Sequence, residues 1–279
     1  MLGALIIVFR EVIEAGLIVG IVLAVTKGIR HNGRWVALGV AAGVAGASLV
    51  AIFAGVIADA LEGAGQEIFN AAILGVAVVM LAWHNIWMAR HGRELAMEMR
   101  TYGEEVKAGS RSLAALAVVV AVAVMREGSE VALFLYGLAA SAKDSGFDLL
   151  IGSGLGLLAG VAVTAVTFLG LIVIPSRYLF SITSVLITFL AAGLAAQSVV
   201  FLQQAGFVTA LQDSAWDTSR FLSDTSLIGR VFHTLIGYSD QPSQMQVAVY
   251  CVTLGVIFTL SKVFAPHQQP KRPVPVLAE

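Results

Sequence analysis

The chain has 279 residues, of which 58% are hydrophobic and only 13% are charged. A soluble domain usually carries about 25% charged residues, so this composition excludes an ordinary soluble protein and indicates a membrane protein. The net charge of −1 excludes a broadly basic nucleic-acid binder, and the single cysteine, Cys251, excludes an intrachain disulfide and a cysteine-based metal site.

A helix needs about 20 predominantly apolar residues to cross the hydrocarbon core of a bilayer. The segments that qualify are, in chain order, residues 2–26, 35–58, 68–89, 113–140, 148–174, 178–203 and 245–264. The sequence therefore predicts an all-α membrane protein with seven transmembrane helices, forming a single transport domain over residues 1–264.

Three further segments lie outside these helices. Residues 90–112 are polar with helical spacing, which fits either a short surface helix or a solvated linker. Residues 204–244 contain Trp216, Phe221, Phe232 and Tyr238 among polar residues, which predicts an ordered external cap. Residues 265–279 are rich in Pro and Gln and are predicted to form a flexible cytoplasmic tail.

The distribution of positive charge predicts how the helices are oriented. Lys and Arg favour every second connection: residues 27–34, residues 90–112, Arg177 and the segment after Lys262. Because Lys and Arg concentrate on the cytoplasmic side, the N-terminus is expected outside and the C-terminus inside. An odd number of spans agrees with this orientation.

Two copies of one charged pattern lie near the middle of the first and fourth predicted helices. Residues Arg10–Glu14 and Arg126–Glu130 both read R-E-x-x-E and are 116 residues apart. A charged side chain at the centre of a membrane helix costs roughly 2.5–3.5 kcal/mol on insertion scales, so these charges require a compensating role. Because each copy opens a set of three helices, the two sets run in opposite directions. This predicts two inverted three-helix repeats plus a C-terminal helix, with a substrate site at the midplane between them.

The spacing of the glutamates indicates a site for a cation. Glu11 and Glu14 share one helix face, as do Glu127 and Glu130, so four carboxylates can converge where the helices cross. Carboxylate oxygens suit hard or borderline cations such as iron, manganese, magnesium or calcium. Four Glu and the two supporting residues, Arg10 and Arg126, sum to −2, which a divalent ion would neutralise. The alternative is that each motif is a self-neutralising structural cluster.

Other polar residues have competing interpretations. His84 is interpreted as a hydrogen-bonded packing residue of the third helix rather than as a ligand. Three external acidic residues could form an entrance for cations or could simply be solvated: Asp59, Glu62 and Glu67. Three amides of the sixth helix could line an entrance or hydrogen-bond neighbouring helices: Gln197, Gln203 and Gln204.

At the two R-E-x-x-E motifs the chain resembles the high-affinity iron permeases of the Ftr/Efe type, the oxidase-dependent iron transporters. The resemblance extends to residues 201–206 and to the last loop and helix, including Asp217, residues 235–238 and Tyr250. It implies seven membrane helices and transport of iron by Glu11, Glu14, Glu127 and Glu130, with Arg10 and Arg126 in support. One departure is Gln204, which stands where the family often has Glu.

The resemblance also implies the setting of the protein. We expect an iron permease of the cell (inner) membrane that imports iron as Fe³⁺ or Fe²⁺, most simply ferric iron supplied after oxidation of ferrous iron. Expected partners are the lipid bilayer and an extracytoplasmic oxidase or iron-binding delivery protein, with no prosthetic group, no enzymatic activity and no nucleic acid.

Three other functions remain open at this point. A related carrier could move another cation such as lead or manganese, since carboxylates bind all of these metals. A membrane di-iron oxidoreductase would typically need Glu-x-x-His pairs, and neither motif has a His at that offset. The third alternative is a purely structural membrane subunit.

Overall fold

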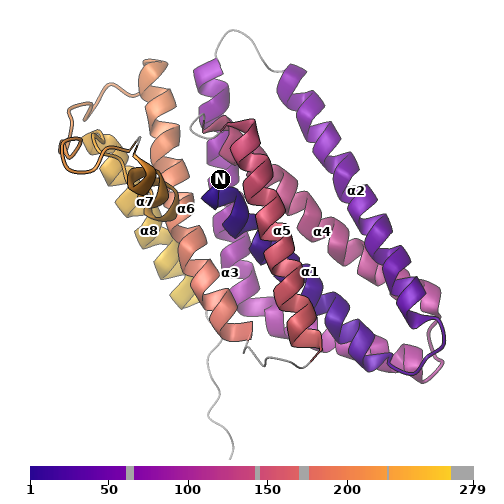
Figure 1. Ribbon diagram of the computed structural model, residues 1–279. Coiled ribbons are helices and arrows are strands. Elements are labelled where there is room, and N and C mark those ends of the chain that lie inside the picture. Colours follow the sequence, from indigo (N-terminus) through magenta and orange to yellow (C-terminus); the bar gives the residue numbers. More distant parts are fainter. Residues whose placement is uncertain (61–65, 142–144, 170–175, 225, 265–279) are drawn as a thin grey trace, which may run out of the picture.

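The computed structural model describes residues 1–60, 66–141, 145–169, 176–224 and 226–264 (Figure 1). Within these residues the regular elements are all helices, which confirms the all-α prediction. They are α1 (Leu2–Val25), α2 (Asn32–Ala60), α3 (Gln66–Lys107), α4 (Leu113–Ala140), α5 (Gly146–Phe168), α6 (Ser176–Gln204), α7 (Leu227–Ile236) and α8 (Gln244–Val263).

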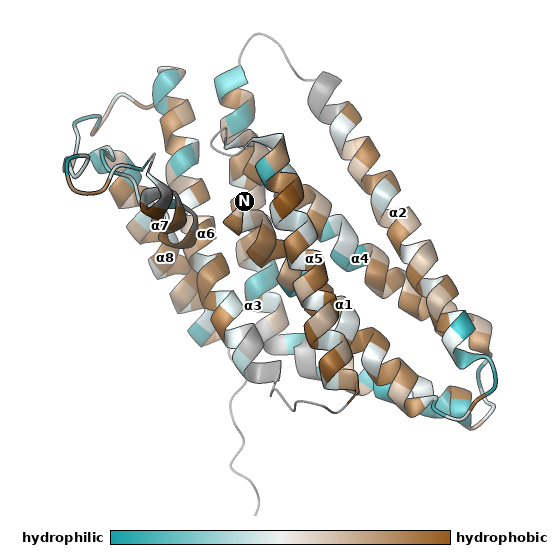
Figure 2. Ribbon diagram, in the orientation of Figure 1, coloured by the Kyte–Doolittle hydropathy of each residue, from teal (hydrophilic) through white to brown (hydrophobic). Residues whose placement is uncertain are grey.

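Five of the described helices are long and apolar enough to cross a membrane. These spans are Asn32–Val56, Gln66–Met88, Gly146–Phe168, Ser181–Gln204 and Gln244–Val263. The strongly hydrophobic colouring of these helices is visible in Figure 2. The two remaining long helices, α1 and α4, have 24 and 28 residues, and each carries the three charged residues of an R-E-x-x-E motif.

Serine residues define where several helices begin. The side chains of Ser112, Ser145, Ser226 and Ser243 accept hydrogen bonds from backbone N–H groups in the first turns of α4, α5, α7 and α8. These N–H groups have no partner within the helix, and a serine hydroxyl oxygen satisfies one of them. At α8 the cap is reciprocal, because Gln246 also accepts from the backbone N–H of Ser243.

The segment after the third predicted span is helical, but it is not a separate helix. α3 runs without interruption from Gln66 to Lys107, so it contains both the predicted span 68–89 and most of residues 90–112. Its last third packs against the end of α1 and the beginning of α4, where Val106 belongs to the same apolar cluster as Val22 and Leu116. The alternative of a solvated linker is therefore wrong.

The first and fourth helices run in opposite directions. The end of α1 lies beside the beginning of α4, where Val22 packs near Val120. The beginning of α1 lies beside the end of α4, where Ile7 packs near Phe134. Figure 1 shows the same arrangement, with α1 descending from the N-terminus and α4 rising past it.

Small residues pack α5 on α1 and α2 on α4 in the same register. Along α5, Gly152, Gly156 and Gly160 lie against Ala4, Val8 and Val12 of α1. Along α2, matching contacts are made by Gly39, Gly43 and Ala47, which lie against Val120, Val124 and Gly128 of α4. The α2 residues precede their α5 counterparts by 113 positions, and the α4 residues follow their α1 counterparts by 116 positions. Both pairs are parallel, and the close approach of their backbones is the expected use of small residues in membrane helices.

The same offset of 113 relates α3 to α6, which are antiparallel. Asn85 Nδ2 donates to the backbone oxygen of Ser184 at 3.2 Å. The equivalent residue, Ser198, donates to the backbone oxygen of Ala71 at 3.0 Å, and Ala71 precedes Ser184 by 113 residues. A side chain of α3 thus donates to the backbone of α6, and the equivalent side chain of α6 donates to the equivalent backbone position of α3.

Residues 204–244, predicted to form an ordered cap, contain α7 and a network of hydrogen bonds. Trp216 Nε1 donates to Ser239 O at 3.2 Å, and Thr218 Oγ1 pairs with Tyr238 Oη at 2.6 Å. α7 ends at Gly237, whose positive φ of 68° and close approach to the backbone of Gly193 on α6 suit a residue without a side chain. The predicted tail, residues 265–279, lies outside the described residues.

Two clusters of buried apolar side chains lie at different levels of the bundle. One includes Ile7, Leu81, Phe134 and Ile187, and the other includes Val22, Val120 and Val124. The charged motifs of α1 and α4 fall between these clusters along both helices. The fold therefore surrounds the charged residues with apolar side chains.

Candidate metal centre

The motif of α1 is buried and internally paired. Arg10 Nη1 donates to Glu11 Oε1 at 2.9 Å, and Arg10 Nη2 lies 2.9 Å from Glu14 Oε1. The three side chains are at most 3% exposed. Residues one and four positions after Arg10 lie within reach of its guanidinium on a helix, so one Arg balances part of the charge of two carboxylates.

The motif of α4 repeats this pattern in a more open setting. Arg126 Nε lies 3.2 Å from Glu130 Oε1 and 3.9 Å from Glu127 Oε1. Glu127 is buried, but Arg126 is 36% exposed and lies 4.3 Å above the ring of Trp87 on α3. Part of the stabilisation of Arg126 is thus a cation–π contact rather than an ion pair.

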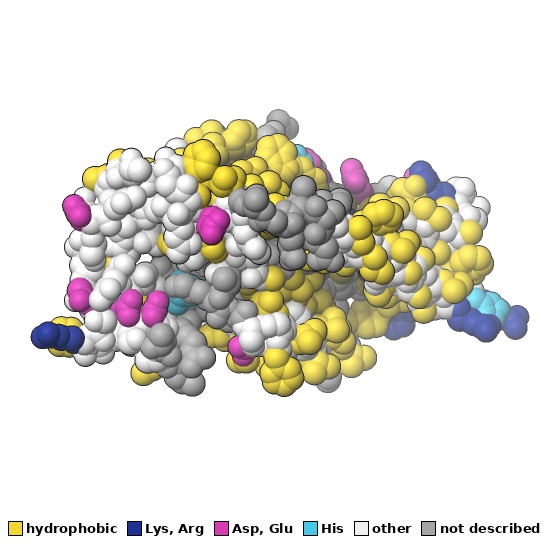
Figure 3. All heavy atoms as spheres, turned by 90° about the horizontal axis from the view of Figure 1, so that it is seen from above, with side chains coloured by type: hydrophobic (Ala, Val, Ile, Leu, Met, Phe, Trp, Pro, Cys, Tyr) yellow, Lys and Arg dark blue, Asp and Glu magenta, His cyan; other side chains and the backbone are white. Residues whose placement is uncertain are grey.

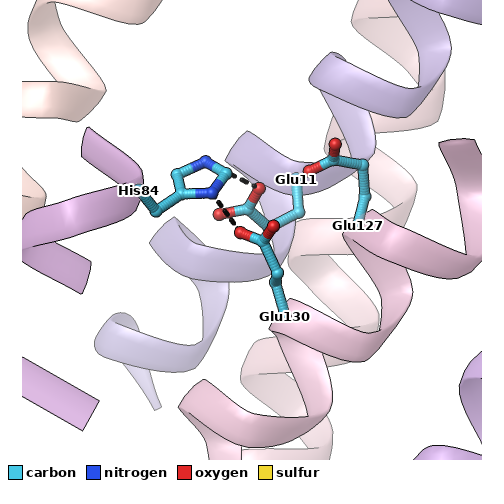
Figure 4. Close-up of side chains that lie close together, drawn as sticks. All are labelled: Glu11, His84, Glu127 and Glu130. Carbon is cyan, nitrogen blue, oxygen red and sulfur yellow. Dashed lines mark ion pairs between the residues drawn. The ribbon is translucent and has the colours of Figure 1, made fainter. Parts of the chain in front are cut away.

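His84 of α3 joins the two motifs. Its Nδ1 contacts Glu130 Oε2, and its Nε2 lies 3.6 Å from Glu11 Oε2 and 3.5 Å from Glu14 Oε2. The ring is 5% exposed and packs edge-on against Phe134, with 6.3 Å between ring centroids. One imidazole thus lies between carboxylates of α1 and α4 (Figure 4).

Four side chains of this cluster can offer ligand atoms to one ion. One ligand atom each from Glu11, His84, Glu127 and Glu130 lies within 4.8 Å of the others. Several buried atoms of the cluster have no hydrogen-bond partner, among them Glu11 Oε2, Glu127 Oε2 and His84 Nε2. Unsatisfied buried polar atoms are costly, and a cation would satisfy several of them at once.

The structure brings together the residues that the sequence singled out. Glu11, Glu127 and Glu130 belong to the four-residue group, and Glu14 borders it through Arg10 and His84. Carboxylates with one imidazole form a donor set that suits first-row transition metals such as iron.

The other sequence candidates lie elsewhere. Glu67 is exposed in the first turn of α3, whereas the side chain of Asp59 and all of Glu62 lie outside the described part. Gln203 Oε1 accepts a hydrogen bond from Ser243 Oγ at 3.2 Å, so this residue links α6 to α8. Seen from above, several Asp and Glu side chains of the described residues lie toward the left of the view, and others lie further across this face (Figure 3).

His84 is the cluster residue that sequence reasoning assigned to packing. The structure buries it against the ring of Phe134 and also against three carboxylates, which makes it a neighbour of the candidate metal centre. A signal was available: His84 and Asn85 are adjacent polar residues inside the otherwise apolar span Gln66–Met88. A buried imidazole in a membrane helix is costly for the same reason as a buried carboxylate.

Comparison with known proteins gives relatives along almost the whole chain. The ferrous iron permease EfeU of Escherichia coli O157:H7 is 32% identical over 253 residues, covering 89% of this chain and 90% of the relative. The proteins of the same name from Shigella sonnei and Yersinia pestis are also 32% identical over 253 residues and 89% of this chain, with 90% and 88% of the relatives covered. No solved structure matches the chain.

A family model agrees with these relatives. The model described as the iron permease FTR1 family matches residues 1–266, which include every described helix. The match confirms the resemblance drawn from the two R-E-x-x-E motifs, and the relatives are named as transporters rather than enzymes. This chain, a multi-pass membrane protein, therefore belongs to the iron permease FTR1 family.

Proposed function

We propose that this chain imports iron across the cell (inner) membrane through the cluster formed by Glu11, Glu14, Glu127 and Glu130. The observation that carries the proposal is the convergence of two R-E-x-x-E motifs, 116 residues apart, from helices that run in opposite directions. Buried carboxylates inside a membrane bundle are expensive, and binding a cation gives them a function.

The proposal extends to the arrangement in the membrane. α1 and α4 would cross the bilayer together with the five apolar spans, making seven, with the N-terminus outside and the C-terminus inside. The opposed directions of α1 and α4 and the matched contacts of the two halves support an inverted repeat. Transporters built this way bind substrate near the midplane, between the repeats.

Ferrous iron is the proposed form at the site. Four Glu and two Arg sum to −2, so a divalent ion makes the cluster neutral when His84 is uncharged. The relatives are named for ferrous iron. The family resemblance instead suggests ferric iron handed over by an oxidase or a delivery protein. Uptake of iron held reduced by ascorbate, compared with uptake of ferric citrate, separates the two: import of ferric iron alone would contradict the ferrous proposal.

The experiment for the site is uptake of radioactive iron into liposomes that contain the purified protein. Glu11→Gln and Glu127→Gln, one in each motif, should each abolish uptake, because each removes a buried carboxylate of the same cluster. The matched control is Glu104→Gln on the exposed part of α3, where Glu104 pairs with the exposed Arg100, and this variant should retain uptake. Wild-type uptake by either cluster variant would contradict the proposed site.

Competition tests the alternative metals. An excess of Mn²⁺ or Pb²⁺ should reduce iron uptake less than the same excess of unlabelled iron does. If either metal competes better than iron, the chain is a carrier of that metal. If the protein consumes dioxygen with iron but imports none, it is a membrane oxidoreductase, for which His84 beside the carboxylates would be the supporting observation.

A further inference from the structure

His84 is a buried polar residue beside the glutamates, and the transport site proposed above does not include it. Its side chain is 5% exposed and reaches from α3 into the cluster of α1 and α4 (Figure 4). An imidazole removed from water needs partners for both ring nitrogens. Among the described residues, only Nδ1 has a close one, Glu130 Oε2.

The second ring nitrogen faces two carboxylates without bonding to either. Nε2 lies 3.6 Å from Glu11 Oε2 and 3.5 Å from Glu14 Oε2, and all three atoms are buried without a hydrogen-bond partner. These separations exceed ordinary hydrogen-bond lengths. They are close to the spacing of about 3.4 Å between neighbouring ligands that lie about 2.1 Å from a tetrahedral metal ion.

Glu130 holds the ring in the orientation that a ligand requires. A metal-binding histidine usually donates its other ring N–H to a carboxylate, which fixes the tautomer and aims the free nitrogen at the metal. Glu130 stands in this place, with Oε2 against His84 Nδ1 and Oε1 accepting from Arg126 Nε at 3.2 Å. Each oxygen of Glu130 thus has a nitrogen atom within ion-pair distance.

The imidazole is present in only one half of the molecule. Asn85 and Ser198 make equivalent hydrogen bonds 113 residues apart, so the residues before them, His84 and Gln197, hold equivalent places on α3 and α6. Gln197 has no ring nitrogen. The imidazole nitrogen is therefore specific to α3, and the equivalent position of α6 does not repeat it.

We infer that His84 Nε2 is a ligand of the transported iron, together with carboxylates of Glu11 and Glu127, and that it favours iron over hard divalent cations. The inference rests on the proposed function and deepens it. Imidazole suits iron and the later first-row metals, whereas sites made only of oxygen also suit Mg²⁺, Ca²⁺ and Mn²⁺. Glu130 acts here as a positioning residue for His84.

X-ray absorption at the iron edge tests the ligand directly. The full-length protein, loaded with ferrous iron alone under anaerobic reducing conditions, should show the multiple scattering of one imidazole. His84→Gln should lose this signal while still binding iron. The matched control is His91→Gln, two turns further along α3, where His91 stacks on Trp87 outside the cluster, and this variant should keep the signal.

Selectivity provides a second readout. In His84→Gln the iron concentration for half-maximal uptake should rise by about tenfold or more, since loss of even an outer partner of a metal ligand typically costs 10–100-fold. The ability of Mn²⁺ to compete should change less, because its preferred oxygen ligands remain. An equal loss for both metals, or no loss for iron, overturns the inference.

The outcomes separate this inference from the proposed function. Iron that binds, depends on Glu11, and shows a shell of oxygen atoms only would overturn the role of His84 and leave the permease intact. Absence of iron uptake by the wild-type protein would overturn both. If His84→Gln does not fold, the wild-type and His91→Gln spectra still decide whether an imidazole other than His91 binds the iron.

Discussion

Arg10 and Arg126 hold equivalent positions in the two motifs but lie in different surroundings. Arg10 is 3% exposed and pairs with both Glu11 and Glu14. Arg126 is 36% exposed and is shared between Glu130 and the face of Trp87. Removing one partner of a buried ion pair leaves an uncompensated charge, whereas an exposed Arg can be replaced in part by water. The two arginines should therefore contribute unequally to stability.

Arg10→Gln should lower the free energy of unfolding by about 3–5 kcal/mol, the usual result of breaking a buried ion pair. Arg126→Gln should lower it by about 1–2 kcal/mol, the size of an exposed ion pair plus a cation–π contact. Thermal unfolding of the purified variants in detergent measures the difference. Equal losses in the two variants would show that their surroundings do not set their contributions.

That glutamates of the two motifs lie close together could be predicted from the sequence, whereas the place of His84 could not. In each R-E-x-x-E motif the two glutamates are three residues apart, so they project from the same face of the helix and their direction can be predicted from the sequence. His84 is one polar residue on a helix whose rotation is set by tertiary contacts, including Asn85 with Ser184 and Thr188. A shift of one residue turns a side chain by about 100°, so sequence alone cannot say whether His84 meets carboxylates or apolar neighbours.

At the level of helices, glycine positions decide how closely pairs approach. Gly156 lies against the backbone of α1, where an added Cβ would meet Leu5 O at 2.6 Å. Gly154, on the same helix, has nothing within 4 Å of the same atom. The two residues thus form a natural comparison between a packed glycine and a free one.

Gly156→Ala should destabilise the protein by about 1–3 kcal/mol, since the added methyl group overpacks the contact between α5 and α1. Gly154→Ala should have no cost and could gain about 0.5–1 kcal/mol, because alanine favours the helix. Unfolding of the two variants in the same detergent is the measurement. A loss of stability in Gly154→Ala as large as that in Gly156→Ala would contradict the packing described here.

The length of α3 shows where hydropathy alone misleads. The apolar pattern ends near Met88. The predicted span 68–89 therefore ends close to the last residue of the apolar segment Gln66–Met88. The helix nevertheless continues to Lys107, through Glu, Leu, Ala, Met and Arg residues that are strong helix formers. α7 escaped prediction for a different reason: ten residues within a polar segment become a helix there through the Ser226 cap and the Gly237 terminus.

For the molecule as a whole, the proposed topology places the two ends of the bundle on opposite sides of the membrane. The connection between α3 and α4 lies at one end, and the segment between α6 and α8 lies at the other (Figure 1). Ala108 and Ala215 are exposed residues in these two connections. Cys251 is the single native cysteine and is also exposed, so it must be replaced before labelling.

In a Cys251→Ser background, Ala215→Cys should react with a membrane-impermeant maleimide in intact spheroplasts. Ala108→Cys should react only after the membrane is permeabilised, because the Lys- and Arg-rich connections are expected inside. Labelling of Ala108→Cys and protection of Ala215→Cys would invert the topology. Labelling of both in intact spheroplasts would contradict an odd number of spans between them.

The pattern of the whole molecule was accessible from the sequence because its signals are long. Long apolar segments, five of which the described residues form as apolar helices, and a pattern repeated after 116 residues can be recognised despite errors of a few residues at each boundary. The choice of neighbours was not accessible: small residues occur in many segments, and only packing shows that α1 pairs with α5 and α2 with α4.

One buried cluster, built from both halves of the chain, is proposed to hold iron on its way through the membrane. Anomalous X-ray scattering at the iron edge from crystals of the full-length protein soaked with ferrous iron locates the metal directly. A peak among Glu11, Glu127 and His84 that disappears in Glu11→Gln is the result we predict. A peak elsewhere in the protein, or one that persists unchanged in Glu11→Gln, would contradict the account.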